Sequence, residues 1–315
     1  MNDSPPRRLV TNNLPTALFL DGPLYSWRTG FIMAMGLWMV LNSSAWAVDP
    51  KFKAYPNVEY ENVNGKPVDL DVYLDPHITW KRPLVIYIHG GGWQGRNKAD
   101  GLVYADSFLK RGYVFATIDY RLTNEAIFPA QIQDVKAAVR FLRAHAAEYR
   151  IDPARIGVMG HSSGGHLASL LGTTNGDPQF DTGDNLSVSN AVQAVCDMSG
   201  PVDFTTPDPA LASMLTKLLG GPVDQRMDLA KLASPINHIS RTSAPFFILH
   251  GAGDPAVPPA ESEAFAAALQ KAGVPVQLEL LPGQPHNLNL WARTGKGNYL
   301  DMVVAFFDAN LKKRT

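Results

Sequence analysis

The sequence predicts an α/β fold in a single domain, built on a mostly parallel β-sheet with helices on both faces. After residue 48, β-rich apolar runs alternate with helical patterns, the order expected of strand–helix–strand units. Several of these runs are short and continuously apolar, as in strands buried on both faces. No internal repeat is visible, and 315 residues with 45% hydrophobic content can bury a large core without a metal or a disulfide.

Eight strands are expected, and they fall into two groups. The first two, 58–63 and 70–74, alternate apolar and polar residues, which indicates early antiparallel strands. The other six are expected at 84–88, 114–118, 156–159, 191–198, 246–249 and 276–281. The prediction is therefore an eight-stranded sheet with an antiparallel start.

Helices are expected between these strands. One begins after Pro129 and has an apolar face made of Ile132, Val135, Val139 and Leu142. A second contains Phe265 and Leu269 and ends at Gly273, because glycine suits a left-handed C-cap. A last helix is expected around 299–306.

Two polar stretches rich in Gly, Asp and Asn, 172–190 and 205–240, are expected to lie over the edge of the sheet that holds the functional site. The second contains a short helical pattern. We therefore expect a small cap at about 205–240.

Charge and cysteine content exclude several classes of function. The net charge is −1 without a long run of one sign, which argues against nucleic acid or an anionic membrane surface as the main partner. The single cysteine, Cys196, lies in an apolar run, where a buried inert thiol is favoured over a catalytic one. No His or Cys pair has ligand spacing, so no metal site is predicted. No cofactor is expected. Asp181 and Asp184 could hold a calcium ion, but a solvated loop is favoured.

The N-terminal segment has the pattern of an export signal. Residues 31–41 are apolar, too short a run for a bilayer but typical of a signal-peptide core, and Ala45-Trp46-Ala47 is a small–x–small cleavage site. We expect 1–47 to be a signal peptide with an N-terminal preamble, and 48–315 to be a secreted or periplasmic catalytic domain. A start codon downstream of Met1 or a long n-region would explain the preamble. The alternative is an uncleaved anchor helix.

Residues 160–164, Gly-His-Ser-Ser-Gly, form a G-x-S-x-G motif between the strand 156–159 and a helical run at 166–171. In this context the middle serine, Ser162, sits on a strained turn that exposes its hydroxyl, and the flanking glycines let strand and helix approach each other. The motif predicts Ser162 as a nucleophile. An N-cap serine is the alternative interpretation.

Residues 89–93, His-Gly-Gly-Gly-Trp, follow the strand 84–88. Three glycines allow main-chain N–H groups to point at one place, as an oxyanion hole requires, and the Lys-Ser/Thr pair of a phosphate loop is absent. His89 suits a hydrogen bond that fixes the loop better than it suits catalysis. Trp93 fits two interpretations equally well, core packing and the wall of an acyl pocket.

These motifs, together with Asp-Tyr-Arg at 119–121 and His-Gly-Ala-Gly-Asp-Pro-Ala-Val-Pro at 250–258, resemble α/β-hydrolase carboxylesterases. The closest resemblance is to bacterial esterases grouped with acetylxylan and feruloyl esterases, near the hormone-sensitive-lipase-like branch, and it covers about 60–307. It implies the α/β-hydrolase fold and an oxyanion hole formed by Gly91, Gly92 and Ser163. That branch usually has an acidic residue before its serine, where this chain has His161. The difference favours the acetylxylan/feruloyl group and the similar kynurenine-formamidase-like enzymes.

In this fold the chain order of a catalytic triad is Ser, then Asp or Glu, then His. Asp254 follows the strand 246–249 and His286 follows 276–281, so both loops leave the same edge of the sheet. The order Ser162, Asp254, His286 fits. Asp203 also follows a strand and competes as the acid, but Asp254 is favoured because it follows the penultimate strand, as the resemblance also implies.

Three other histidines lie near these motifs. His250 is expected to be buried and hydrogen-bonded, and His166 is expected to be structural. His161 also favours a structural role, although it is a candidate for lining the substrate pocket together with Trp93.

The sequence predicts a serine esterase that forms an acyl-enzyme with small acyl or aryl-acyl esters, such as acetyl or feruloyl groups on polysaccharide. One alternative is an N-formyl amide hydrolase of the kynurenine-formamidase type, which export argues against. The other is a non-catalytic binding protein on the same scaffold. The only partner expected is the ester substrate, with no nucleic acid and, after signal cleavage, no membrane; the oligomeric state is not predicted.

Overall fold

The computed structural model describes residues 48–288, 293–294 and 297–312, so the expected signal peptide at 1–47 lies outside the described residues. The main sheet has the strand order β1-β2-β4-β3-β5-β6-β7-β8. The strands are β1 (Lys53–Val63), β2 (Lys66–Leu74), β3 (Arg82–Ile88), β4 (Val114–Ile118), β5 (Ile151–His161), β6 (Ala194–Met198), β7 (Phe246–Gly251) and β8 (Val276–Leu281). Two further short strands, β9 (Arg293–Thr294) and β10 (Gly297–Asn298), pair separately.

Pairing in the sheet is antiparallel only at its start. β2 pairs antiparallel with β1 and with β4, whereas β3 to β8 are mutually parallel. The predicted eight-stranded, mostly parallel sheet is therefore confirmed. Because the carboxyl ends of parallel strands meet at one edge, the residues that follow β3, β5, β7 and β8 lie along the same edge of the sheet.

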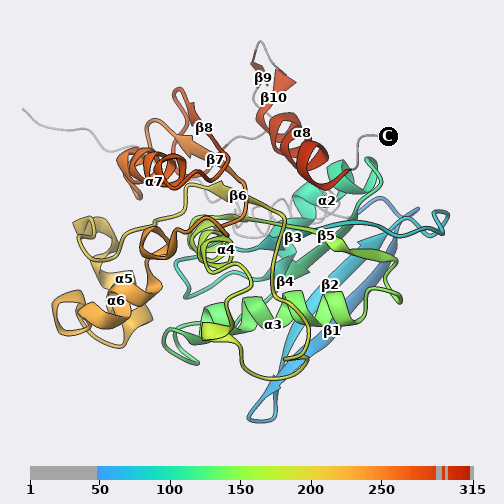
Figure 1. Cartoon of the computed structure of the whole chain (residues 1–315), viewed down its shortest axis with the longest axis horizontal. Helices are drawn as coiled ribbons and strands as arrows, with labels where there is room; N and C mark the ends of the chain where they lie inside the picture. The colour runs from blue at the N-terminus through green and yellow to red at the C-terminus, as the bar shows by residue number, and fades with distance from the viewer. Residues whose placement is uncertain (1–47, 289–292, 295–296, 313–315) are drawn as a thin grey trace, which may run out of the picture. The chain divides into compact units, whose positions relative to one another are not determined.

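Helices cover both faces of the sheet (Figure 1). They are α2 (Leu102–Leu109), α3 (Ala130–Ala144), α4 (Ser163–Thr173), α5 (Ala212–Leu219), α6 (Met227–Ala233), α7 (Pro259–Lys271) and α8 (Tyr299–Leu311). The helix α3 begins directly after Pro129, and Gly273 has a φ of 79° just beyond α7, as the sequence predicted. Helix α2 was not predicted, since it has eight residues and no capping side chain.

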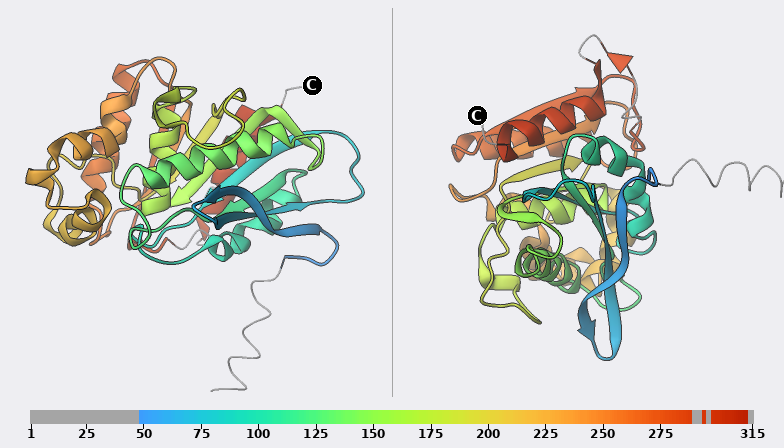
Figure 2. Two further views of the ribbon diagram at one scale, coloured as in Figure 1. Left: turned by 90° about the horizontal axis from the view of Figure 1, so that it is seen from below. Right: turned by 90° about the vertical axis from the view of Figure 1, so that its right-hand side faces the viewer.

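Apolar residues form two cores, one on each face of the sheet. The helices α3, α4 and α7 supply one core, in which Val139, Leu170 and Phe265 are fully buried. The helices α2 and α8 supply the other through residues such as Phe108 and Phe307, and Figure 2 shows the two layers from further directions. Cys196 lies in this second core, where burial raises the pKa of its thiol.

The expectation for 172–190 was wrong, because this segment lies away from the carboxyl edge. Helix α4 carries the chain back to the amino edge of the sheet, where the side chains of α3 hold the segment. Arg140 pairs with Asp181 at 2.5 Å, and Arg143 donates to the carbonyl oxygen of Ser189. Asp181 therefore neutralises a buried guanidinium rather than lying free in a solvated loop.

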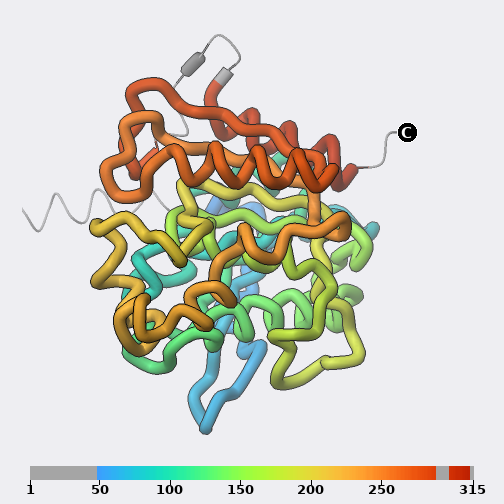
Figure 3. Tube along the Cα trace, turned by 60° about the vertical axis from the view of Figure 1, so that its left-hand side comes forward, coloured from blue at the N-terminus to red at the C-terminus, as the bar shows by residue number. Residues whose placement is uncertain are grey.

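The segment 205–240 does lie at the carboxyl edge, and it contains α5 and α6. A Cβ atom placed on Gly92 would lie 2.6 Å from Sδ of Met214, so α5 packs against the glycine loop. Figure 3 shows this helical insertion at one side and the β1–β2 hairpin as a separate projection from the body. Within the described ranges, no helix is long and apolar enough to span a bilayer.

Candidate active site

The turn between β5 and α4 has the geometry that the Gly-x-Ser-x-Gly motif predicted. Ser162 has φ 57° and ψ −122°, a backbone conformation that residues other than glycine rarely adopt. A Cβ atom on Gly160 would lie 2.3 Å from the carbonyl oxygen of Gly164, and one on Gly164 would lie 2.1 Å from that of Ile88. The two glycines therefore permit the close approach of strand and helix that holds Ser162 in this turn.

The structure brings Ser162, His286 and Asp254 together in one hydrogen-bonded series. Nε2 of His286 lies 2.9 Å from Oγ of Ser162, and Nδ1 lies 2.7 Å from Oδ2 of Asp254. A carboxylate can only accept, so Nδ1 carries the hydrogen and donates to Asp254. Nε2 is then free to accept the hydroxyl proton of Ser162. This is the arrangement in which an imidazole can serve as a general base.

Asp254 is ionised in its buried position. Burial of the carboxyl opposes ionisation, but hydrogen bonds from His250 and His286 and from the main-chain N–H groups of Val257 and Ala256 hold the pKa of Asp254 well below its ordinary value. Its side chain is fully buried. The carboxylate can therefore stabilise an imidazolium on His286 without taking its proton.

A second histidine contacts the same carboxylate. Nε2 of His250 lies 3.2 Å from Oδ2 of Asp254 and 2.9 Å from the carbonyl oxygen of Val257. Both atoms are acceptors, so Nε2 carries a hydrogen. Nδ1 lies 2.7 Å from Oγ of Ser262, and the ring is fully buried. The sequence predicted a buried, hydrogen-bonded His250; it gave no signal for the contact with Asp254.

His161 links the serine turn to the loop of His286. Its Nε2 donates to the carbonyl oxygen of His286 over 2.7 Å, and the two ring centroids lie 5.0 Å apart. Burial, partly opposed by this hydrogen bond, lowers the pKa of His161 to about 4. The ring is therefore neutral near pH 7, with its hydrogen on Nε2.

The glycine loop lies directly over Ser162. A Cβ atom on Gly90 would lie 3.4 Å from Cβ of Ser162, and Gly91 and Gly92 have φ values of 105° and 61°. Within the described residues, the N–H groups of Gly91, Gly92 and Ser163 donate to no protein acceptor. Free main-chain donors beside a nucleophile are what an oxyanion hole needs.

The side chain of His89 fixes this loop by a hydrogen bond to the loop backbone, as the sequence predicted. Nδ1 of His89 donates to the carbonyl oxygen of Gly90 over 2.8 Å, and the ring stacks on Tyr120 at 4.3 Å. The hydroxyl of Tyr120 donates to the carbonyl oxygen of His89. Asp119 accepts from the main-chain N–H of Lys98 at 2.7 Å, which anchors the far end of the loop.

Trp93 lies in the core and not in a pocket. Its side chain is 1% exposed, and its indole N–H donates to Nδ1 of His166 over 3.2 Å. His166 in turn donates from Nε2 to the carbonyl oxygen of Ala233. A buried indole with its only donor occupied packs the loop against the helical insertion, so the structure favours core packing over the acyl-pocket interpretation of Trp93.

The carboxylate of the competing acid, Asp203, is bonded to Thr205 and, within the described residues, makes no hydrogen bond with His286. Its Oδ1 accepts from the main-chain N–H and from the hydroxyl of Thr205, at 2.8 and 2.6 Å. The structure thus places Asp254, and not Asp203, beside the imidazole. In the described part of the chain, no cluster of three or more His, Cys, Asp or Glu side chains could hold a metal ion.

A cavity of about 580 Å³ opens beside the serine turn, and we call it the site cavity. His161, Met198, Asn287 and Leu288 line the side next to the triad, and Tyr87, Arg96, Ala99, Asp100, Leu102, Val103 and Tyr104 line the rest. The lining combines aromatic rings, aliphatic side chains and an Arg–Asp pair. Sequence reasoning identified His161 as a lining residue but missed the contribution of 96–104, which carries no motif.

Three comparisons relate the chain to known proteins. A family model described as BD-FAE matches residues 70–269. Esterase LipQ of Mycobacterium tuberculosis is 34% identical over 231 residues, which cover 71% of this chain and 55% of the relative. A truncated form of a carbohydrate esterase from gut microbiota is 33% identical with a TM-score of 0.76, covering 83% of this chain and 97% of that structure.

The structure of Thermogutta terrifontis esterase 2 phosphonylated by sarin is 25% identical with a TM-score of 0.72, covering 84% of this chain and 98% of that structure. The chain spans about half the length of the curated relatives that it matches.

Proposed function

The chain belongs to the BD-FAE family and has the α/β-hydrolase fold, and from this premise we propose that it hydrolyses carboxylic esters through an acyl-enzyme on Ser162. The observation that carries the proposal is the series Ser162–His286–Asp254, with contacts of 2.9 and 2.7 Å beside main-chain N–H groups that find no acceptor in the described part of the chain. Each part that acyl transfer requires is then present: nucleophile, base, orienting carboxylate and oxyanion donors.

In the first half-reaction, Oγ of Ser162 attacks the ester carbonyl carbon while Nε2 of His286 takes the hydroxyl proton. The carbonyl oxygen becomes an oxyanion, which the N–H groups of Gly91, Gly92 and Ser163 stabilise; one such donor typically contributes about 3 kcal/mol. The carbon–oxygen bond to the alcohol then breaks, and the imidazolium gives its proton to the leaving oxygen. The acyl group remains on Ser162.

In the second half-reaction, a water molecule attacks the acyl carbon and gives its proton to Nε2 of His286. The bond from the carbon to Oγ of Ser162 breaks, and the imidazolium returns the proton to Oγ. Asp254 stays ionised throughout, because its hydrogen bonds keep its pKa low. Its role is to hold the ring and to stabilise the imidazolium.

The site cavity supports small acyl or aryl-acyl esters as substrates, including acetyl or feruloyl groups on polysaccharide. Its volume of about 580 Å³ exceeds the needs of an acetyl group, and Tyr87 and Tyr104 offer aromatic surface. The similarity to a carbohydrate esterase supports a sugar as the alcohol part. We also propose that 1–47 directs export and is removed after Ala47, and N-terminal sequencing of the exported protein tests this.

The test of the proposed function is covalent labelling together with turnover. We expect the wild type to hydrolyse 4-nitrophenyl acetate and to be phosphorylated by diethyl 4-nitrophenyl phosphate on the peptide that contains Ser162. Ser162→Ala should lose both properties, with turnover falling by several orders of magnitude. Ser187→Ala, a change at an exposed serine near the opposite edge of the sheet, should alter neither. Labelling of a different residue would overturn the assignment.

A further inference from the structure

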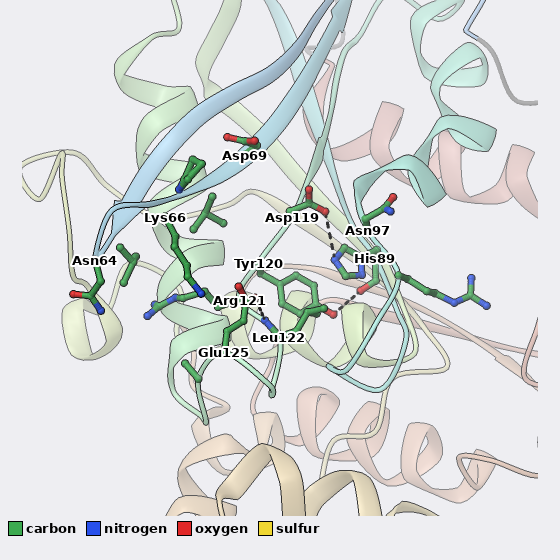
Figure 4. A pocket seen from close by; sticks show the side chains of 15 residues that line it. Asn64, Lys66, Asp69, His89, Asn97, Asp119, Tyr120, Arg121, Leu122 and Glu125 are labelled. Carbon is green, nitrogen blue, oxygen red and sulfur yellow. Dashed lines mark hydrogen bonds and ion pairs between the residues drawn. The ribbon is translucent and has the colours of Figure 1, made fainter.

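A second cavity lies on the other side of the glycine loop, between that loop and the β1–β2 hairpin, and we call it the hairpin cavity. Its volume is about 390 Å³. Residues of the hairpin between Val63 and Asp69 form one wall, and the segment Asp119–Ala126 forms the facing wall. Figure 4 shows Lys66 extending from the hairpin toward the segment that carries Glu125. None of the residues proposed to carry out acyl transfer lines this cavity.

The hairpin cavity adjoins the active site. Arg96 lines both the hairpin cavity and the site cavity. His89 lines the hairpin cavity and immediately precedes Gly90, whose added Cβ atom would lie 3.4 Å from Cβ of Ser162. Both cavities therefore border the loop that covers Ser162, with Arg96 between them.

The charges around the hairpin cavity are balanced. The cations are Lys66, Arg96 and Arg121, and the anions are Asp69, Asp119 and Glu125. Each of the two facing walls carries both signs, so a ligand with a net charge of either sign would meet a group of its own sign on each wall. The balance therefore favours a neutral ligand with many polar groups.

The polar groups that are available for a ligand include both donors and acceptors. Within the part of the chain that the structure describes, the side chains of Asn64, Lys66 and Asp69 make no hydrogen bond or ion pair with the protein. An ammonium donates, a carboxylate accepts and an amide does both, which matches the hydroxyl groups of a sugar. Pro67, Val68 and Leu122 add apolar surface that can contact the C–H faces of a sugar ring.

We propose that the hairpin cavity binds a neutral sugar unit of a glycan whose ester is held at Ser162. This inference rests on the proposed function, because it gives that esterase a polymeric alcohol as the second half of its substrate. Arg96, at the boundary of the two cavities, would contact the link between the esterified sugar and its neighbour.

Binding without catalysis tests the site directly. In the Ser162→Ala protein, unesterified xylotetraose should shift the backbone amide NMR signals of 63–69 and 119–126. Lys66→Ala and Asp69→Asn should each weaken this binding about tenfold, since each loses a charge-assisted hydrogen bond. Lys81→Ala, at an exposed lysine just before β3, is the matched control and should bind as tightly as the parent. Shifts confined to other regions, or tighter binding of anionic oligogalacturonate, would overturn the proposal.

Turnover separates this inference from the proposed function. In the otherwise wild-type enzyme, Lys66→Ala and Asp69→Asn should raise KM for acetylated xylo-oligosaccharides about tenfold and leave 4-nitrophenyl acetate hydrolysis within twofold. Equal effects on both substrates, or on neither, would show that the hairpin cavity binds no sugar. A wild type that hydrolyses no ester at all would instead reject the esterase function, whatever the binding experiment shows.

Discussion

Nε2 of His161 donates to the carbonyl oxygen of His286 over 2.7 Å, so the residue before the proposed nucleophile holds the backbone of the residue proposed as the base. The bond joins two segments that are 125 positions apart in the chain. A neutral ring supplies the donor, since burial lowers the pKa of His161 to about 4. Positions of reacting groups must be held to within about 1 Å, so this contact has a direct bearing on catalysis.

The first prediction concerns this donor. His161→Phe keeps an aromatic ring but removes the N–H, so the loop of His286 loses its anchor to the serine turn. We expect kcat to fall about tenfold or more with a smaller change in KM, because the contact orients the base rather than the substrate. Stopped-flow and steady-state measurements with 4-nitrophenyl acetate provide the check.

His161→Gln provides the internal control for that experiment, because an amide can donate over a similar reach. We expect it to recover part of the lost kcat. If His161→Phe and His161→Gln reduce kcat equally, or if only KM changes, the ring acts by filling space or by contacting substrate and not through its hydrogen bond.

The second prediction separates the two candidate acids. In Asp254→Asn the amide would donate to Nδ1 of His286 and impose the wrong tautomer, so kcat should fall about 10³- to 10⁴-fold. Asp203→Asn should lower kcat less than threefold, because among the described residues the Asp203 carboxylate accepts hydrogen bonds from Thr205 alone. Greater damage from Asp203→Asn would show that the acid has been misassigned.

The sheet and the two glycine-rich turns could be predicted because local residue types determine them. Continuous apolar runs indicate the buried parallel strands, and a strained turn such as that at Ser162 tolerates few sequences around it. Helix α2 escaped prediction because its eight residues have no capping side chain. The position of 172–190 was predicted wrongly because the direction of α4 was left out of account: a segment between α4 and the parallel strand β6 lies at the amino edge, where the Arg140–Asp181 pair then holds it.

At the candidate site, too, features set by local sequence could be predicted, and features set by contacts between distant loops could not. The order of Ser162, Asp254 and His286 along the chain was enough to propose that they meet. The contacts of His161 with a backbone carbonyl and of His250 with Asp254 depend on loop geometry. Trp93 could not be assigned from sequence, because an aromatic residue after a glycine loop fits a core and a pocket wall equally well. Only its burial separates the two.

The third prediction concerns the glycine that follows the nucleophile by two positions. A Cβ atom on Gly164 would lie 2.1 Å from the carbonyl oxygen of Ile88, a backbone atom that cannot move without shifting β3. Gly164→Ala should therefore destabilise the protein by about 2 kcal/mol or more. Gly95→Ala is the control, because nothing lies within 4 Å of its added Cβ atom. Urea unfolding curves of both variants measure the difference, and equal stability would contradict the close approach.

The fourth prediction is a pH dependence of stability that comes from Asp197. This carboxyl is fully buried; burial raises its pKa to about 6, partly opposed by hydrogen bonds from Ser169 and Gly200 and by His250. In the unfolded chain the carboxyl titrates near 3.8. The folded state therefore binds the proton more tightly, and this stabilising contribution is lost as the pH rises through about 6.

Asp197→Asn lacks the ionisation, so its stability relative to the wild type should increase with pH. Integration of the linkage relation between pH 5 and pH 8 gives a relative gain of about 1.4 kcal/mol for the variant. Urea unfolding of both proteins at the two pH values measures this difference directly. A relative stability that is constant, or that falls as the pH rises, would mean that Asp197 is already ionised at pH 5 in the folded protein. In that case its hydrogen bonds with Ser169 and Gly200 outweigh the effect of burial.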